Sequence, residues 1–367
     1  MRIAYVINSL EGGGAASPVP DIARILRDCG AEVRLFALTR RNGRALPAII
    51  EAGLDPLIRE GGEWDHLAAC RWLDREVMAW GATHIWTSLS RASIFGLLIG
   101  PRRGLPVICW QHNAFLRPWN RRLLRILQSR AMLWVGDSHV VSALTAQRLG
   151  VPDARLATWP IFSADPAMPQ AKPWQPGETL RIGSLGRLHP AKGYDVLIAA
   201  LARLRADGFA PPCPISVTVA GEGHERERLE AMAREAGLDN ITFPGFAEHP
   251  RHFLADLHLY VQPSRREGFC IAAHEAMAAA LPVIASAVGE MPYTLTDGVS
   301  GRIVPPEDVE ALAEALREML RDPAALHNLG QAARLRVLDR FSRANFHAAG
   351  AEIVARLRGE QLFRTAR

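Results

Sequence analysis

The sequence predicts an α/β protein with two domains, each built on a parallel β-sheet. Two observations lead to this prediction. Short apolar strands alternate with helices along the chain, and the alternation starts again after a proline-rich stretch near the middle. Alternation of this kind favours a parallel sheet covered by helices on both faces. A chain of 367 residues is also longer than one domain usually is.

The first half opens with a strand at Ile3–Asn8, a glycine turn at Gly12–Gly14, and a helix that Gly30 ends. Further short apolar segments continue the pattern, and we expect strands at Val33–Leu38, His84–Thr87, Pro106–Trp110 and Leu133–Gly136. We assign residues 1–165 to this first domain. Five prolines between Pro160 and Pro176 then interrupt the pattern and predict a linker at residues 166–178.

The second half repeats the architecture, and we assign residues 179–343 to a second domain. The expected strands are Leu180–Leu185, Ile215–Ala220, Ile241–Phe243, Leu257–Gln262 and Pro282–Ala285. The expected helices are Val196–Arg205, Arg226–Ala236, Ala272–Ala280 and Val309–Leu320. A last helix, Ala344–Leu357 within 344–367, is expected to pack back on the first domain. Two similar domains predict a cleft between them, where ligands commonly bind.

Composition excludes several classes of protein and site. The five cysteines form no CxxC pair, which disfavours zinc and structural disulfides and favours a reducing cytoplasm. The apolar run at the N-terminus is too short for a signal peptide, and no run approaches the ~20 residues that span a bilayer. Residues 1–165 carry 20 arginines against 14 acidic side chains, and no acidic residue lies between Glu76 and Asp137. Such a surface attracts anions.

A basic loop follows the strand at Leu180–Leu185. It runs from Gly183 to Gly193, precedes a helix, and contains Gly186, Arg187 and Lys192. Two cations and a helix N-terminus at one strand end favour a diphosphate, because guanidinium binds phosphate in a fork and ammonium binds as a point charge. An ordinary basic βα-loop is the alternative.

A second loop carries two carboxylates eight positions apart, Glu267 and Glu275. If the segment were helical throughout, they would lie about 12 Å apart along the axis. That span suits two sugars joined by a diphosphate, with one carboxylate accepting hydroxyl hydrogen bonds from each. Gly268 would let backbone amides approach the phosphates. The alternative is one loop glutamate and one glutamate on a solvated helix face.

These motifs resemble the large retaining GT-B glycosyltransferases of glycosyltransferase family 4, which have two Rossmann-like domains facing across a cleft. The resemblance rests on GRL-x-x-x-KG at Gly186–Gly193, E-x7-E at Glu267–Glu275, and the continuation EAMAAALPVIAS. It implies that Arg187 and Lys192 bind the donor diphosphate, Glu267 holds the transferred sugar, and Glu275 contacts the ribose. Gly268 and Phe269 would lie along the phosphates and the sugar. We further expect Gly221 and Gly223 to border the nucleotide and Phe246 to line the base.

The first half of the chain resembles the family in fewer residues. The glycine turn, with Gly13 and Gly14, is similar to the family's loop that faces the donor, and it lacks the third glycine of a dinucleotide fingerprint. A tight turn with no ligand is the alternative. His112, just past a strand end, resembles the family's histidine near the reacting sugar, with a hydrogen-bonding and electrostatic role rather than a nucleophilic one. A structural histidine is the alternative there.

No metal and no cofactor is expected, because the chain has no D-x-D triplet and two cations could stabilise the leaving diphosphate, as in the family's front-face retaining mechanism. The chain departs from the family's usual glycine pair with Gly289-Glu290-Met291-Pro292-Tyr293, and with Cys270 in place of a frequent glycine. The donor sugar pocket is therefore expected to differ.

We predict a hexosyl transfer from a UDP- or GDP-sugar to a saccharide, here a lipid-linked polysaccharide precursor. The alternatives are a sugar-nucleotide epimerase and a non-catalytic nucleotide-sugar-binding protein. Arginines beside Trp119 and several leucines suit peripheral contact with an anionic membrane at its inner face, and a solvated helix is the alternative reading. No nucleic acid is expected as a partner, because no binding motif accompanies the arginines.

Overall fold

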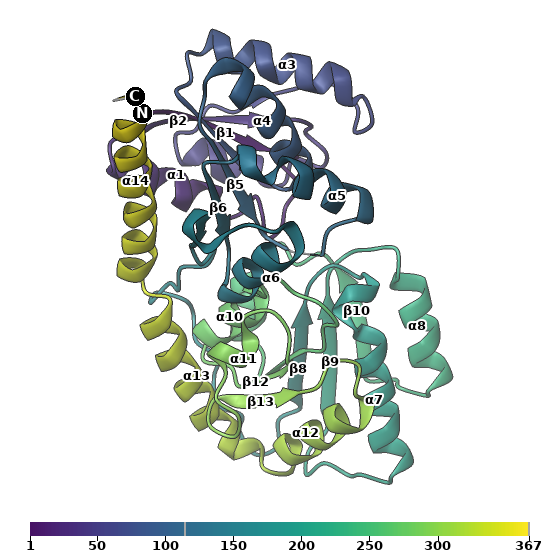
Figure 1. Cartoon of the computed structure of the whole chain (residues 1–367). Coiled ribbons are helices and arrows are strands. Elements are labelled where there is room, and N and C mark those ends of the chain that lie inside the picture. The colour runs from purple at the N-terminus through teal and green to yellow at the C-terminus, as the bar shows by residue number, and fades with distance from the viewer. Residues whose placement is uncertain (114, 366–367) are drawn as a thin grey trace. The chain divides into compact units, whose positions relative to one another are not determined.

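The computed structural model describes residues 1–113 and 115–365, and it divides into two compact units. The first unit holds Met1–Phe162 together with the described residues from Ala344 on, and the second holds Ser163–Arg343. Each unit is a parallel β-sheet with helices around it (Figure 1). The prediction of two parallel-sheet α/β domains is confirmed.

The first sheet has the order β3-β2-β1-β4-β5-β6-β7, and all of its pairings are parallel. Its strands are β1 (Arg2–Ile7), β2 (Glu32–Ala37), β3 (Leu57–Ile58), β4 (His84–Ser88), β5 (Val107–Gln111), β6 (Leu133–Gly136) and β7 (Leu156–Thr158). Strand order reverses between β1 and β4, and ligands of doubly wound sheets bind at the carboxyl ends of strands beside such a point.

The helices of the first unit are α1 (Val19–Asp28), α2 (Leu46–Glu51), α3 (His66–Ala79), α4 (Ser90–Arg103), α5 (Pro118–Leu127), α6 (His139–Leu149) and most of α14 (Arg343–Thr365), with short 3₁₀ turns η1 (Gln128–Arg130) and η2 (Asp153–Arg155). Buried tryptophans fill part of the core, where Trp110 and Trp159 stack with ring centroids 4.9 Å apart. Phe346 of α14 packs on Trp159 at 5.3 Å, and Arg356 donates to the carbonyl of Leu156. The final helix therefore completes the first unit.

The second sheet has the order β10-β9-β8-β11-β12-β13, again wholly parallel. Its strands are β8 (Leu180–Leu185), β9 (Ile215–Ala220), β10 (Ile241–Gly245), β11 (Leu259–Gln262), β12 (Val283–Ser286) and β13 (Gly301–Val304). Its helices are α7 (Tyr194–Ala206), α8 (Arg226–Glu235), α9 (Pro250–Ala255), α10 (Ile271–Ala278), α11 (Met291–Thr294), α12 (Val309–Arg321) and α13 (Leu326–Arg340), with 3₁₀ turns η3 (Pro190–Lys192) and η4 (Pro323–Ala325). Order reverses here between β8 and β11.

Several expected bounds in this unit are wrong by one or two residues, and two of these differences have a clear local cause. The strand expected from Leu257 begins at Leu259, because the Leu257 amide donates to the Leu254 carbonyl in the turn after α9. The side chain of Leu257 fills the space beside Gly183 that a Cβ would occupy. The helix expected through Ala280 ends at Ala278, since Ala280 has a left-handed backbone with φ +59°.

The proline-rich stretch, which we expected to be a linker, packs on the second unit. The amide of Ala164 donates to the carbonyl of Phe341, and the buried Arg334 of α13 donates to the carbonyls of Pro166, Met168 and Ala278. One guanidinium thus ties this stretch to the end of α10, because its five N–H groups can serve several carbonyls at once.

Candidate functional site

The loop after β8 ends in η3, which brings Lys192 to the loop that follows β11. The turn requires Gly193, whose φ is +66° and whose position leaves no room for a side chain: an added Cβ would lie 2.0 Å from the carbonyl oxygen of Pro263. Lys192 Nζ lies 2.7 Å from Glu267 Oε1 in a largely buried ion pair. Burial alone would lower the pKa of Lys192, but the charge and hydrogen bond of Glu267, together with Cys270 and Tyr194, outweigh burial and the pKa is raised.

Glu267 is held by its own loop. Its Oε1 also accepts from Ser264 Oγ at 2.6 Å and from Gln262 Nε2 at 3.3 Å. Among the described residues, no group donates to Oε2 of this carboxylate. A fixed carboxylate with one oxygen still to be satisfied can accept a hydrogen bond from a ligand hydroxyl. Gln262 and Ser264 were not predicted as site residues, although both lie where β11 ends and, like the predicted residues, follow a strand at its carboxyl end.

Arg187 lies in the same loop as Lys192, and its side chain is exposed. It forms no ion pair with a carboxylate of the described residues. Its guanidinium therefore adds a positive charge at this end of the sheet, five positions before Lys192, whose own charge is offset by Glu267. Gly186, between the strand and Arg187, sits against Tyr194, whose hydroxyl would lie 2.8 Å from an added Cβ.

The geometry that we derived for the two glutamates by assuming a continuous helix is wrong. Glu267 lies in a loop, and α10 begins only at Ile271, because Cys270 adopts a left-handed backbone with φ +79° and ψ +54°. Glu275 alone is helical. It is half-buried, and burial raises its pKa to about 7, against a small opposing effect of Arg251. No described residue donates a hydrogen bond to its carboxyl group.

Aromatic and histidine side chains support the start of α10. Phe269 is buried against His274, with ring centroids 4.3 Å apart. His274 bridges the Cys270 carbonyl, 2.8 Å from Nδ1, and the Thr294 hydroxyl, 3.0 Å from Nε2. Burial lowers its pKa to about 4, so it is neutral near pH 7. Gly268 belongs to the same loop, and its carbonyl would lie 2.8 Å from a Cβ added at Gly289.

The loop after β9 packs directly on the loop after β8. A Cβ added at Gly221 would lie 1.9 Å from the Gly186 carbonyl oxygen, and one at Gly223 would lie 2.0 Å from that of Leu188. Both glycines are therefore required by backbone contact, whether or not a ligand is bound. Phe246, just past β10, is 47% exposed. A large aromatic side chain in contact with solvent can stack on the flat ring of a ligand.

His112 belongs to the first unit and is buried at the end of β5. Its Nε2 lies 2.6 Å from Ser88 Oγ at the end of β4, and its ring stacks on Trp110. Asp137 Oδ2 is 3.8 Å from Nδ1, beyond hydrogen-bonding distance. Burial lowers the pKa of His112 to about 3, so the imidazole is neutral. Sequence reasoning missed Ser88, although it too stands at a strand end.

A cavity of about 200 Å³ opens beside His112 within the first unit. Polar side chains, among them those of Gln111, Asn113, Arg117 and Asn120, line it together with apolar ones. Leu89, also on the wall, has φ +76°, a conformation that costs a leucine energy and that proteins tend to keep at binding sites. Such a cavity can hold a hydroxyl-rich or anionic ligand.

The glycine turn of the first unit is a compact loop. The Gly13 carbonyl accepts from the amides of Ala16 and Ser17, and Gly13 has φ +145° with no atom within 4 Å of an added Cβ. Gly14 is exposed. The open space beside Gly13 shows that backbone conformation, and not crowding, is what requires glycine there.

In the described parts of the chain, no group of three His, Cys, Asp or Glu side chains is placed to hold a metal ion. The five cysteines are all free thiols. Across residues 1–113 and 115–365, no helix is both long and apolar enough to cross a membrane.

Two Rossmann-like units, one of which gathers an ion pair and several glycines at the carboxyl ends of its strands, define the GT-B class. The sequence profile described as Glycosyl transferases group 1 matches residues 170–336, and that of Glycosyltransferase Family 4 matches residues 12–162. The chain belongs to glycosyltransferase family 4.

Named relatives are similar to this chain in sequence, and a solved structure is similar to it in fold. A glycogen synthase of Mycobacterium tuberculosis is 34% identical over 226 residues, which are 60% of this chain and 50% of that protein. A D-inositol 3-phosphate glycosyltransferase of Kribbella flavida is 27% identical, over 88% of this chain and 86% of that one. The chain thus spans about half the length of the glycogen synthase it matches. The crystal structure of Anabaena HepE in complex with UDP-glucose superposes with a TM-score of 0.84 at 19% identity, over 97% of this chain and 99% of that one.

Proposed function

We propose that the chain is a retaining hexosyltransferase that moves a sugar from a UDP- or GDP-sugar to a saccharide acceptor. The observation that carries this proposal is the buried ion pair of Lys192 and Glu267, 2.7 Å long, beside the reversal of strand order between β8 and β11. One partner matches a phosphate and the other matches a sugar hydroxyl. The names of the relatives, which are glycosyltransferases, support the same reaction class.

In this proposal the donor is held by the second unit. Lys192 and Arg187 bind the diphosphate, and their charge stabilises it as it leaves. Glu267 accepts hydrogen bonds from the transferred sugar, and Glu275 accepts them from the ribose. The remaining contacts are assigned to Gly186, Gly221, Gly223, Phe246, Gly268 and Phe269. The positive charge of these side chains would stabilise the leaving diphosphate without a bound metal.

The first unit supplies the acceptor site and His112. A neutral imidazole can donate or accept one hydrogen bond at each nitrogen, so His112 is proposed to bind the sugar and to shape the charge near the anomeric carbon. Its lowered pKa argues against a cationic role. Gly13 and Gly14 form the backbone of the loop proposed to face the donor, and the cavity beside His112 is proposed to take the acceptor.

A lipid-linked acceptor and contact with an anionic membrane surface are part of the proposal. On α5, Trp119 and Ile126 are 65% and 66% exposed, next to the exposed Arg121, Arg122 and Arg125. Exposed apolar side chains beside cations suit the headgroup region of a membrane. Co-sedimentation with anionic but not with neutral lipid vesicles tests this contact, and equal recovery with both would contradict it.

One assay separates transfer from its alternatives. Purified protein is incubated with UDP- and GDP-hexoses, with and without bacterial lipid extract, and released nucleoside diphosphate is measured. Release that depends on the extract supports transfer. An isomerised donor would instead support an epimerase, and donor binding without turnover would support a binding protein.

A further inference from the structure

The two loops that carry Lys192 and Glu267 are joined by a second connection, centred on Arg265. Its amide donates to the Ala191 carbonyl at 2.8 Å, and the amide of Arg266 reaches the same oxygen at 3.3 Å. The Arg265 guanidinium also donates to the carbonyl of Pro190 at 2.8 Å. Backbone and side chain of one residue thus hold η3 against the loop after β11.

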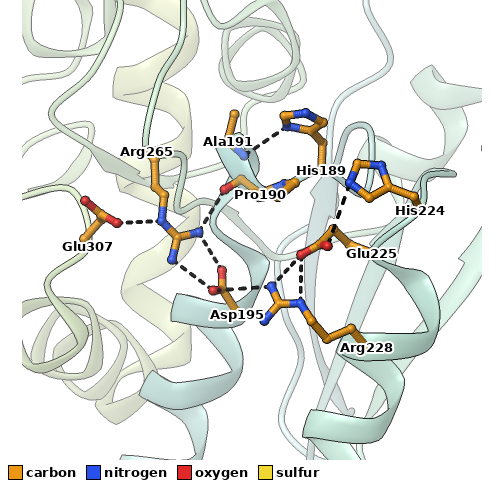
Figure 2. A network of polar contacts seen from close by, with 9 residues as sticks. All are labelled: His189, Pro190, Ala191, Asp195, His224, Glu225, Arg228, Arg265 and Glu307. Atoms are coloured by element: carbon orange, nitrogen blue, oxygen red, sulfur yellow. Dashed lines mark hydrogen bonds and ion pairs between the residues drawn. The ribbon is translucent and has the colours of Figure 1, made fainter.

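The guanidinium is anchored by carboxylates on both sides (Figure 2). Its Nη1 and Nη2 form a fork on Asp195, at 2.7 and 2.9 Å, and its Nε donates to Glu307 at 2.7 Å. Asp195 lies in the first turn of α7, directly after η3. Only a planar group with several donors can bind both carboxylates at once. A lysine ammonium cannot do so.

Charge balance indicates that Arg265 is not a phosphate ligand itself. Asp195 and Glu307 offset its positive charge, and both side chains of the Arg265–Asp195 pair are about one-fifth exposed. Although burial alone would raise it, hydrogen bonds from Arg265 leave the pKa of Asp195 below its usual range. Four of the five guanidinium N–H groups of Arg265 already donate to these partners, whereas Arg187 forms no ion pair with a carboxylate of the described residues.

We infer that Arg265 and Asp195 form a brace that positions Lys192 and Glu267 for the donor diphosphate and sugar. Arg265 acts through other residues, so it is a positioning residue. On the α8 side the network continues to Arg228, which lies 3.5 Å from Asp195 and 2.5 Å from Glu225, and on the other side it reaches Glu307. This inference rests on the proposed function, because it assumes that the two loops bind a nucleotide sugar.

The test is a double-mutant cycle on the full chain, read as affinity for UDP and GDP by calorimetry. Arg265→Met and Asp195→Ala are each expected to weaken binding about tenfold, since small misplacements of binding groups are costly. The double variant should bind no more weakly than either single variant, because both substitutions remove the same connection, the fork between Arg265 and Asp195. Arg103→Met is the matched control, since Arg103 forms an equally complete fork on Asp74 in the first unit; its affinity should equal that of wild type.

Other results would overturn the inference in recognisable ways. If Arg265 bound the phosphates directly, Asp195→Ala would keep or increase affinity while Arg265→Met lost it. If the brace served stability alone, the folded Arg265→Met variant would bind like wild type. If the wild type bound neither nucleotide, the proposed function would fail and the inference with it. Should Arg265→Met not fold, Arg265→Lys carries the test, because it keeps the charge and loses the fork; faster amide exchange over residues 189–193 is the accompanying signature.

Discussion

Glu275 combines burial on a helix with the ribose-binding role that we propose for it. It is half-buried on α10, its carboxyl group accepts no hydrogen bond from the described residues, and its pKa is raised to about 7 by burial. A carboxyl group in this state is partly protonated at neutral pH. Ribose hydroxyls would donate to the ionised form, so donor binding favours loss of that proton.

Donor affinity should therefore rise with pH. Between pH 6 and pH 8 the ionised fraction of Glu275 increases roughly tenfold, and the affinity for UDP-glucose or GDP-mannose should increase by up to that factor. Titration calorimetry at the two pH values measures it. Glu275→Gln should bind more weakly and show a flatter dependence. An affinity that falls as pH rises would contradict the ribose role.

The start of α10 illustrates a constraint at the scale of an element. Cys270 is buried in a left-handed conformation, which costs an L-residue about 1–2 kcal/mol. His274 and Phe269 pack around this turn and hold it. The strain persists because the surrounding contacts fix the loop that carries Glu267.

Substitutions at Cys270 should follow backbone conformation. Cys270→Gly should change the free energy of unfolding by less than about 1 kcal/mol, because relief of strain offsets the entropy that glycine loses. Cys270→Val should destabilise by about 2 kcal/mol or more, since a β-branched residue tolerates this conformation poorly. Urea unfolding of both variants measures the difference. Equal stability of the two would show that the turn relaxes when substituted.

Sequence patterns predicted some elements better than others. Strands Leu133–Gly136, Leu180–Leu185 and Ile215–Ala220 were predicted at their observed bounds, because buried parallel strands are short apolar runs bounded by turn residues. The strands β3, β7 and β13 were missed, since edge strands of two to four residues have little apolar periodicity. The break before α10 was also invisible, because nothing in the sequence marks Cys270 as left-handed.

For the site, sequence showed residue types and strand ends but not contacts. The loops with Lys192 and Glu267 were identified from charge and position, while their direct ion pair needed the fold to bring residues 75 positions apart together. Arg265 received no role from the sequence, because a fork on Asp195 depends on the same long-range packing.

At the scale of the whole molecule, buried neutral histidines link stability to pH. In the described residues, burial lowers the pKa of His84, His258 and His274 to about 4 and that of His112 to about 3. These groups bind protons more readily when unfolded, so their contribution to stability is present above pH 6.5 and is lost as pH falls toward 4. Glu275 acts in the opposite direction, but it is one group against four.

The protein should therefore be less stable at pH 5.5 than at pH 7. Each buried histidine contributes about 1 kcal/mol to this difference. Chemical denaturation at the two pH values measures it, with circular dichroism as the signal. Stability that is equal or higher at pH 5.5 would mean that these side chains reach solvent.

The ion pair of Lys192 and Glu267 joins the two loops at the strand ends and supplies the charged groups on which the proposed reaction depends. The chain has one other lysine, Lys172, which is exposed in the same unit and serves as a matched control. The most direct test compares the affinity for UDP-glucose and GDP-mannose in Lys192→Ala, Lys172→Ala and wild type. We expect the donor affinity of Lys192→Ala to be about 100-fold lower or more, because a charged contact to phosphate is lost. The donor affinity of Lys172→Ala should equal that of wild type. Donor affinity that is unchanged in a folded Lys192→Ala would contradict the account.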